Sequence, residues 1–401
     1  MNFRFKLLIM AAVLLAAISL QGQNKSAGIN LSLWKGISTQ PLESDQTTYF
    51  NLGVLSAINR LQGVSINILA STVSDSALGI QVSGIANIAG GEMKGIQISG
   101  ISNVSGDSMV GIGITGLINI AGNESKGLLA AGLANITGDN SKGALVSSLL
   151  NIAGNEFAGV NIAGLANIVG EGNKGVTVSG LSNVVGGSTS GVQVTGLLNI
   201  TGRDAAGVQI SGGMNIAGNK ASGLQLGSVN MAEELNGVQV GIFNYYNQKT
   251  KGFQLGLVNA NPETKVQWMF FGGNATKMNV AARFKNKLLY TILGVGPYYL
   301  DFSDKFSASA FYRAGLELPL YKKLYISGDL GFQHIELFNN KKKNEHTPAR
   351  LYALQARINL EYKVSKQLGV FVTGGYGGSR YYNKARTYDK GVIIEAGIVL
   401  L

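Results

Sequence analysis

The chain has 401 residues, 33 Lys and Arg against 22 Asp and Glu, and no cysteine. The lack of cysteine excludes disulfides, thiolate catalysis and thiolate metal sites, and only His334 and His346 could serve as imidazole ligands. Since no Ser-His-Asp set or cluster of metal-ligating residues stands out either, the composition predicts a protein that is not an enzyme and needs no cofactor.

The first residues carry a pattern typical of export. Two basic residues precede an uncharged run from Leu7 to Leu20, and small and polar residues follow it. The run is shorter than the roughly 18 to 20 apolar residues that a membrane-spanning helix needs. It therefore predicts a secretory signal peptide over 1–22, with cleavage near Gly22.

A short unit repeats along most of the chain. A glycine recurs every sixteen residues from Gly63 to Gly223, and shorter units begin at Gly237 and Gly252. An asparagine lies eight places after the glycine in nine successive units, and seven places after it in the shorter ones. These nine asparagines form the most regular polar column and are the candidate structural site: Asn87, Asn103, Asn119, Asn135, Asn151, Asn167, Asn183, Asn199 and Asn215.

Each unit has the pattern of a strand followed by a turn. In GVQVTGLLNITGRDAA, which begins at Gly191, apolar residues such as Val192 and Val194 alternate with polar residues such as Gln193 and Asn199. Alternation of this kind in β-branched residues predicts strand. Turn-forming and charged residues gather at the end, so a unit is about twelve uncharged residues of strand and about four of turn.

Two all-β architectures fit such a unit. In an antiparallel outer-membrane β-barrel or meander, each unit is one membrane-crossing strand, with apolar side chains facing lipid and the asparagines facing the lumen. In a parallel β-solenoid of sixteen-residue coils, joined to a smaller C-terminal β-barrel, the asparagines stack into an internal ladder. The uncharged length, which matches the about 9 to 11 residues of a spanning strand, and a hairpin pattern at 59–63 favour the barrel.

Other features favour the solenoid. Residues 51–242 contain a single aromatic residue, Phe157, whereas membrane barrels carry aromatic girdles. The shift of the asparagine from the eighth to the seventh place also reverses its strand parity, which a corner tolerates better than a continuous strand does. We favour barrel strands and keep the solenoid as the alternative.

The last third has a different composition. From Val266 onward, about eight alternating segments rich in Tyr and Phe are separated by charged loops, which is typical of outer-membrane strands. This third holds 19 Lys and Arg against 9 Asp and Glu, which indicates contact with anionic lipid or lipopolysaccharide, since an exported protein rarely meets nucleic acid. We expect the first and last strands to pair. The predicted regions are a signal peptide (1–22), N-terminal strands (23–62), the Gly- and Asn-rich repeats (63–265) and a basic barrel-type region (266–401).

Two of the shorter units add a resemblance. GVQVGIFNYYNQKTK and GFQLGLVNANPETK resemble the G-V-Q-x-G-x-x-N surface repeats of exported proteins from Gram-negative bacteria. The whole chain resembles a group of outer-membrane repeat proteins from Bacteroides-type bacteria. The resemblance implies a place in the outer membrane and implies no activity.

One motif with a possible chemical meaning lacks the structural context that it needs. The segment from Gly111 to Gly116 matches G-x-G-x-x-G, but a dinucleotide site needs a helix after it, and here another repeat follows. The sequence therefore predicts a non-enzymatic outer-membrane barrel that is structural or a passive pore. The alternative is a surface-displayed repeat protein for adhesion or for binding a ligand or partner.

Overall fold

The computed structural model describes residues 28–40, 46–248, 251–274, 276–297, 300–301, 305–338, 350–382 and 387–401. Within these ranges every regular element is a β-strand, which confirms the all-β fold. No helix in the described ranges is long and apolar enough to cross a membrane. The predicted signal peptide and its cleavage point near Gly22 lie outside the described residues. The chain forms two compact units that meet between Gly227 and Ser228.

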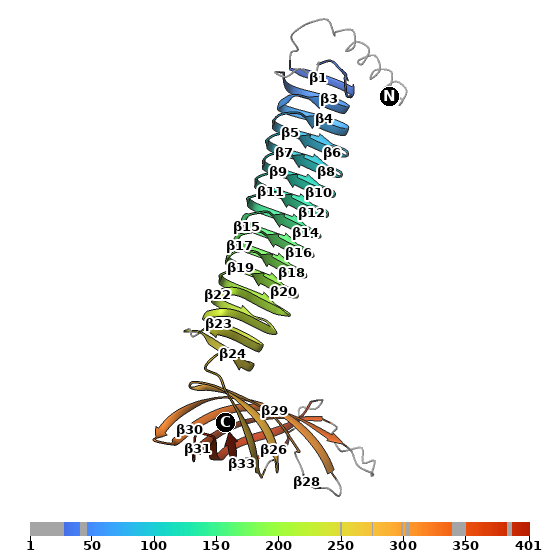
Figure 1. Ribbon diagram of the computed structural model, residues 1–401. Coiled ribbons are helices and arrows are strands. Elements are labelled where there is room, and N and C mark those ends of the chain that lie inside the picture. The colour runs from blue at the N-terminus through green and yellow to red at the C-terminus, as the bar shows by residue number, and fades with distance from the viewer. Residues whose placement is uncertain are drawn as a thin grey trace. The chain divides into compact units, whose positions relative to one another are not determined.

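The first unit is a stack of parallel coils (Figure 1). A typical coil holds a strand of seven or eight residues, a bend, a strand of four residues and a turn. Equivalent residues of successive coils pair sixteen places apart, as Gly111 does with Gly127 and Asn119 with Asn135. The strands of this unit are β1 (Ile29–Trp34), β2 (Ile37–Ser38), β3 (Thr47–Ile58), β4 (Arg60–Val73), β5 (Ala77–Ser83), β6 (Ala86–Ala89), β7 (Met93–Ser99), β8 (Ser102–Ser105), β9 (Met109–Thr115), β10 (Ile118–Ala121), β11 (Ser125–Ala131), β12 (Ala134–Thr137), β13 (Ser141–Ser147), β14 (Leu150–Ala153), β15 (Glu156–Ala163), β16 (Ala166–Val169), β17 (Gly172–Ser179), β18 (Ser182–Val185), β19 (Thr189–Thr195), β20 (Leu198–Thr201), β21 (Ala205–Ser211) and β22 (Met214–Leu226).

This pairing corrects our first interpretation of the repeats. They are coils of a parallel β-solenoid, and not antiparallel strands that cross a membrane one after another. The expected hairpin at 59–63 is also wrong, because β3 and β4 run parallel with Thr47 opposite Arg60. The alternative architecture, a solenoid joined to a smaller C-terminal barrel, is confirmed. Alternation with period 2 is common to both arrangements, so it could not separate them.

The glycine that begins each unit answers a steric requirement of the stack. Gly127 has a φ of 124°, a region that side chains disfavour. A Cβ atom at this position would lie 2.0 Å from the carbonyl oxygen of Gly111 in the preceding coil. Coils can approach to hydrogen-bonding distance at this point only when the residue is glycine.

The interior of the stack divides into an apolar part and a polar part. Next to the turns, buried side chains such as Met93, Met109, Ala153 and Phe157 form one hydrophobic cluster. Toward the bends the buried side chains are Asn, Gln, Ser and Thr. Burial of a polar side chain is tolerated only when it is hydrogen-bonded, so the polar part depends on the ladder described below.

The second unit begins with two further parallel strands and continues as a barrel. β23 (Val229–Gln248) pairs in parallel with β24 (Phe253–Ala260), with Asn244 opposite Asn259. The remaining strands are antiparallel: β25 (Lys265–Gly273), β26 (Asn279–Asn286), β27 (Leu289–Gly296), the short β28 (Leu300–Asp301), β29 (Lys305–Tyr321), β30 (Leu324–Phe338), β31 (Arg350–Lys363), β32 (Leu368–Tyr381) and β33 (Thr387–Leu400).

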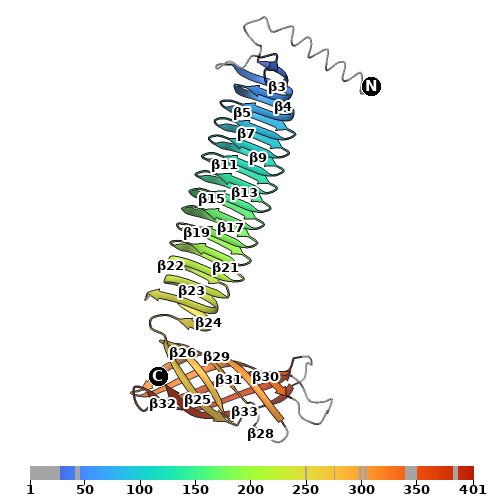
Figure 2. The ribbon, with the colours of Figure 1, turned by 45° about the vertical axis from the view of Figure 1, so that its right-hand side comes forward.

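Eight of these strands close a barrel, whose tilted strands are visible in Figure 2. β27 pairs with β29, and β25 pairs with β33 with Trp268 opposite Leu400. The predicted pairing of the first and last strands of the chain is therefore wrong. β1 pairs in the solenoid, with Ile29 opposite Phe50, because it continues the stack of coils.

Candidate functional site

The asparagine column is a continuous hydrogen-bonded ladder inside the first unit. Nδ2 of each asparagine donates to Oδ1 of the asparagine sixteen residues later, over distances of 2.8 to 3.2 Å, from Asn87 to Asn215. All nine side chains have no exposed surface. Of the two settings that the sequence left open, a lumen lining and a buried stack, the structure places them in the stack.

Each asparagine also holds the bend of the next coil. Nδ2 of Asn119 donates to the carbonyl oxygen of Ala130 at 3.0 Å, and Nδ2 of Asn135 donates to that of Val146 at 2.9 Å. These carbonyl groups lie near the ends of β11 and β13, where the chain turns toward the four-residue strand. The side-chain amide thus satisfies a backbone acceptor that the bend removes from the strand ladder.

The second unit carries a column of the same kind. Nδ2 of Asn230 donates to Oδ1 of Asn244, and Nδ2 of Asn244 donates to Oδ1 of Asn259, both at 2.8 Å. Gln254 donates in the same way to Gln239 at 2.8 Å. The spacings of 14 and 15 residues between these asparagines therefore leave the polar column in register.

Charge on the outside of the repeats is confined to one edge. Every charged residue between Leu61 and Lys220 lies in the last four places of its unit, at the turn and at the start of the next long strand. Neighbouring charges pair there, as Lys126 does with Glu124 at 2.7 Å. The hydrogen bond and the negative charge of Glu124 raise the pKa of the Lys126 ammonium group.

The opposite edge, at the bends, is aliphatic and exposed. One Ile or Leu of each coil, 38 to 46% exposed, follows the bend glycine or serine. The strand faces between the two edges are also aliphatic outside. The residues of this bend edge are Ile85, Ile101, Leu117, Leu133, Leu149, Leu165, Leu181 and Leu197.

The barrel has the opposite polarity to a water-soluble domain. In β31, Leu354, Ile358 and Leu360 point outward and are exposed, whereas Arg357 and Glu361 point inward and are buried. Other exposed apolar side chains continue this outer band: Val266, Trp268, Phe270, Leu316, Leu318, Leu330, Phe332, Val370, Val372, Val392, Ile394 and Ile398. An apolar outside, a polar inside and eight closed antiparallel strands define the class of outer-membrane-type β-barrels.

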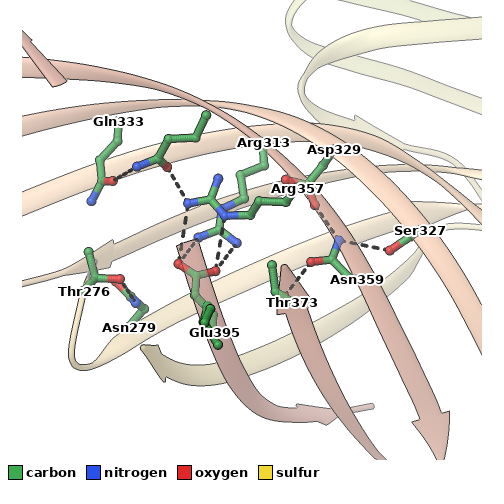
Figure 3. A network of polar contacts seen from close by, with 12 residues as sticks. Thr276, Asn279, Arg313, Ser327, Asp329, Gln333, Arg357, Asn359, Thr373 and Glu395 are labelled. Carbon is green, nitrogen blue, oxygen red and sulfur yellow. Dashed lines mark hydrogen bonds and ion pairs between the residues drawn. The ribbon is translucent and has the colours of Figure 1, made fainter. Parts of the chain in front are cut away.

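The inside of the barrel holds a network of charged and polar groups (Figure 3), beside a cluster of buried apolar side chains that includes Phe271, Phe311 and Phe371. Arg313 donates from Nη1 and Nη2 to the carboxylate of Glu395 at 3.1 and 3.3 Å, and Arg357 lies 3.3 Å from the same carboxylate. Arg283 donates to Glu361 at 2.7 Å. These buried charges come from different strands, so each ion pair braces the wall across the lumen.

A second group of contacts surrounds Asp329. Nδ2 of Asn359 donates to Oδ2 of Asp329 at 2.7 Å, and the hydroxyl group of Tyr290 donates to the same oxygen at 3.0 Å. Thr373 donates to Oδ1 of Asn359 at 2.6 Å. The cavity between these side chains and Arg283 has about 10 Å³ of space for water-sized molecules, which is the space that about one water needs.

The sequence reasoning missed this network, although a signal was present. Arg357 and Glu361 lie four places apart, as do Arg313 and Glu317, and such residues share one face of a strand. Opposite charges that repeat on the inner face of several strands indicate a lumen bridged by ion pairs.

The other candidates gain no chemical role from the structure. Gly111 to Gly116 lies in β9 and the bend after it, with no helix to hold a phosphate. His334 contacts the hydroxyl group of Tyr382 at 2.8 Å through Nδ1, and His346 lies outside the described residues. Within the described residues, no group of three His, Asp or Glu side chains could hold a metal ion.

Comparison with protein-family models and with curated proteins found no match. Among solved structures, the chain is similar to the N-terminal β-barrel domain of Pseudomonas aeruginosa OprF, at 14% identity and a TM-score of 0.24. That match covers 34% of this chain and 95% of the OprF domain. It is also similar to Neisserial surface protein A, at 10% identity and a TM-score of 0.23, over 34% of this chain and 93% of that one.

Proposed function

We propose that this protein is a non-enzymatic structural component of the outer membrane, in which the barrel is an anchor and the solenoid is the working part. The observation that carries this proposal is the polarity of the barrel. Its outer band of aliphatic and aromatic residues suits lipid, and its lumen is filled by buried pairs such as Arg313 with Glu395. A filled lumen disfavours the passive pore.

The connections of the barrel support a location of the solenoid on the periplasmic side. At one rim the connections are short, at 287–288, 322–323 and 364–367. At the other rim they are longer, at 274–278, 297–304, 339–349 and 382–386. Outer-membrane barrels place their short turns in the periplasm and their longer loops outside the cell.

The repeats join the barrel at the short-turn rim. β25 begins there at Lys265, opposite Lys285 near the end of β26. The linker residue Thr264 contacts Asn286, and Nδ2 of Asn286 donates to the carbonyl oxygen of Asn259 at 3.1 Å. Because β25 begins at this rim, the chain that precedes it reaches the barrel from the side of the short turns, which favours an envelope role over surface display.

Two measurements test the anchor. Carbonate or urea extraction of membranes should leave the protein in the pellet, and recovery in the soluble fraction would contradict the proposal. The purified protein in a planar bilayer should give no large, steady conductance, because buried ion pairs such as Arg313 with Glu395 cross the lumen. A wide, open channel would restore the pore interpretation.

The absence of native cysteine permits a direct test of sidedness with single thiols. Met278→Cys lies on the long-connection rim, Lys287→Cys on the short-turn rim and Asn123→Cys on a solenoid turn. On intact cells, a membrane-impermeant maleimide should label only Met278→Cys. The other two should react only after the outer membrane is permeabilised. Labelling of Asn123→Cys on intact cells would support surface display instead.

The same rim is the proposed contact for anionic lipid. Lys322, Lys323 and Lys366 lie on its turns and are exposed. Headgroup phosphates are suitable partners for a ring of lysines at the membrane surface. Insertion into liposomes should be faster when part of the lipid is phosphatidylglycerol, and should lose this preference when these lysines are replaced by glutamine.

A further inference from the structure

The widest uncharged surface of the solenoid is formed by the outward residues at the second and fourth places of each sixteen-residue unit, in its longer strands. We call it the aliphatic face. None of its residues is buried, and none is polar: Ile80, Val82, Ile96, Ile98, Ile112, Ile114, Leu128, Ala130, Ala144, Val146, Val160, Ile162, Val176, Val178, Val192, Val194, Val208 and Ile210. A continuous apolar patch of this kind marks an interaction site.

We propose that the aliphatic face binds the aliphatic face of a second copy of this chain. The area of the face is large enough for a stable contact between two copies. Nine strands spaced about 4.8 Å apart, each about 23 Å long with the lysine border included, give a face of roughly 900 Å². Two such faces together bury about 1,800 Å², which lies within the range of stable, specific interfaces.

The spacing of the coils also matches between two copies. Side chains on this face form columns along the stack, because residues such as Val146 and Ile162 repeat once per coil. A second copy has the same spacing between coils, so the side chains of one sheet fit between those of the other over the whole length. Identical columns that interdigitate in this way make dry, tightly packed interfaces.

The border of the aliphatic face is charged. Lys94, Lys126, Lys142 and Lys174 are exposed along its turn side. An apolar centre with a charged rim is the usual composition of a protein interface. The outer face of the four-residue strands is narrower, and its area of about half that size falls below the range of stable interfaces.

Disulfide trapping in the full-length, membrane-inserted protein tests the proposal. Val146→Cys lies in the central coil of the face, where the two copies approach each other whether the rods are parallel or antiparallel. Mild oxidation should give a covalent dimer with a yield about tenfold above that of the turn variant Asn123→Cys, because docking raises the effective thiol concentration. Equal, low yields for the two variants would overturn the proposal.

A pair of charge variants tests the same contact in detergent solution. Val146→Lys with Ile162→Lys places charges on the aliphatic face, and should raise the dissociation constant of the dimer by at least about a hundredfold. Ile152→Lys with Ile168→Lys places them on the narrower face and should leave the dimer intact. If the dimer survived the lysines on the aliphatic face and was lost with the lysines on the narrower face, the choice of face would be overturned.

A labelling experiment can also show whether acyl chains, and not a second copy of the chain, cover the aliphatic face. A monomeric protein whose Val146→Cys thiol reacts with a maleimide confined to the bilayer would assign the face to acyl chains, and would overturn the second copy. The proposal does not depend on the side of the membrane on which the solenoid lies. Failure of dimerisation would therefore leave the anchor and its sidedness unchanged, and those are measured by extraction and by labelling.

Discussion

Asn119 and Asn135 are joined by a hydrogen bond of 2.8 Å between Nδ2 of the first and Oδ1 of the second, inside the solenoid and away from water. Because the same Nδ2 group donates to the carbonyl oxygen of Ala130 at 3.0 Å, one side chain links two coils and also holds a bend. The repeat therefore extends a continuous polar network with each copy, and the length of the rod can change without a new core.

Asn135→Leu should destabilise the solenoid clearly. The change leaves Oδ1 of Asn151 without a donor, and leaves the carbonyl oxygen of Val146 without its side-chain partner. Each buried polar group that loses its partner costs about 1 to 3 kcal/mol. Denaturant unfolding followed by circular dichroism measures the loss.

The matched control is Asn123→Leu, on an exposed turn of the same solenoid. Asn123 donates to Asp107 at 3.1 Å in contact with water, so the midpoint of unfolding should hardly move. An unchanged midpoint for Asn135→Leu as well would contradict the buried ladder.

Gly127→Ala should also destabilise the stack, for a steric reason. The new methyl group would lie 2.0 Å from the carbonyl oxygen of Gly111, at a φ of 124°. The unfavourable dihedral angle alone costs about 1 to 3 kcal/mol, and the overlap adds to it. Gly172→Ala is the control, since a Cβ atom there meets its nearest neighbour at 3.5 Å. Equal thermal midpoints for the two variants would argue against close approach of the coils at Gly127.

The sequence was sufficient for the fold class, and one residue shows why it did not decide the architecture. In the unit from Gly191, strand parity groups Leu197 with Gln193 and Asn199. In the structure Gln193 and Asn199 are buried, but Leu197 is 46% exposed. The bend at Gly196 and Leu197 turns this side chain outward. A leucine at a position that shares its strand parity with polar residues therefore indicates a bend. In a straight strand, this leucine would point to the same side as Gln193 and Asn199.

The barrel was easier to predict because its alternation is not interrupted. In β31, inward and outward positions alternate from Leu351 to Glu361 without a break. The ion pairs of the lumen were not predicted, since the pairing of Arg313 with Glu395 depends on which strands face each other across the barrel. That information lies in the closure of the sheet and not in any local pattern.

Deletion of residues 127–142 should be tolerated. It removes one complete coil and brings Gly143 to the place of Gly127, so every column stays in register and each remaining coil contacts only its neighbours. Deletion of two coils, 127–158, should give an equal folding yield. Deletion of eight residues, 127–134, is the contrasting variant, because it places a long strand over a short one and should abolish folding. If the folding yield fell when one coil was deleted and recovered when two were deleted, the result would favour antiparallel strands.

Glu395→Gln should destabilise the barrel and leave the solenoid unaffected. Glu395 receives hydrogen bonds from Arg313 and lies 3.3 Å from Arg357, and all three side chains are buried. Because glutamine removes the negative charge and keeps the shape, two guanidinium groups would remain in the lumen without their counter-ion. Loss of one partner of a buried ion pair costs about 3 to 5 kcal/mol.

The control for this change is Glu336→Gln, which removes an ion pair with Arg350 at 3.0 Å on the exposed part of the barrel. Exposed ion pairs contribute about 0 to 1 kcal/mol to stability, so the urea midpoint of this variant should be close to that of the wild type. Urea unfolding in detergent micelles, followed by the heat-modifiable migration of the folded barrel on gels, compares the two. If Glu395→Gln matched Glu336→Gln in its midpoint, the charged network would not brace the lumen, and the interpretation of the barrel as a filled anchor would lose its main support.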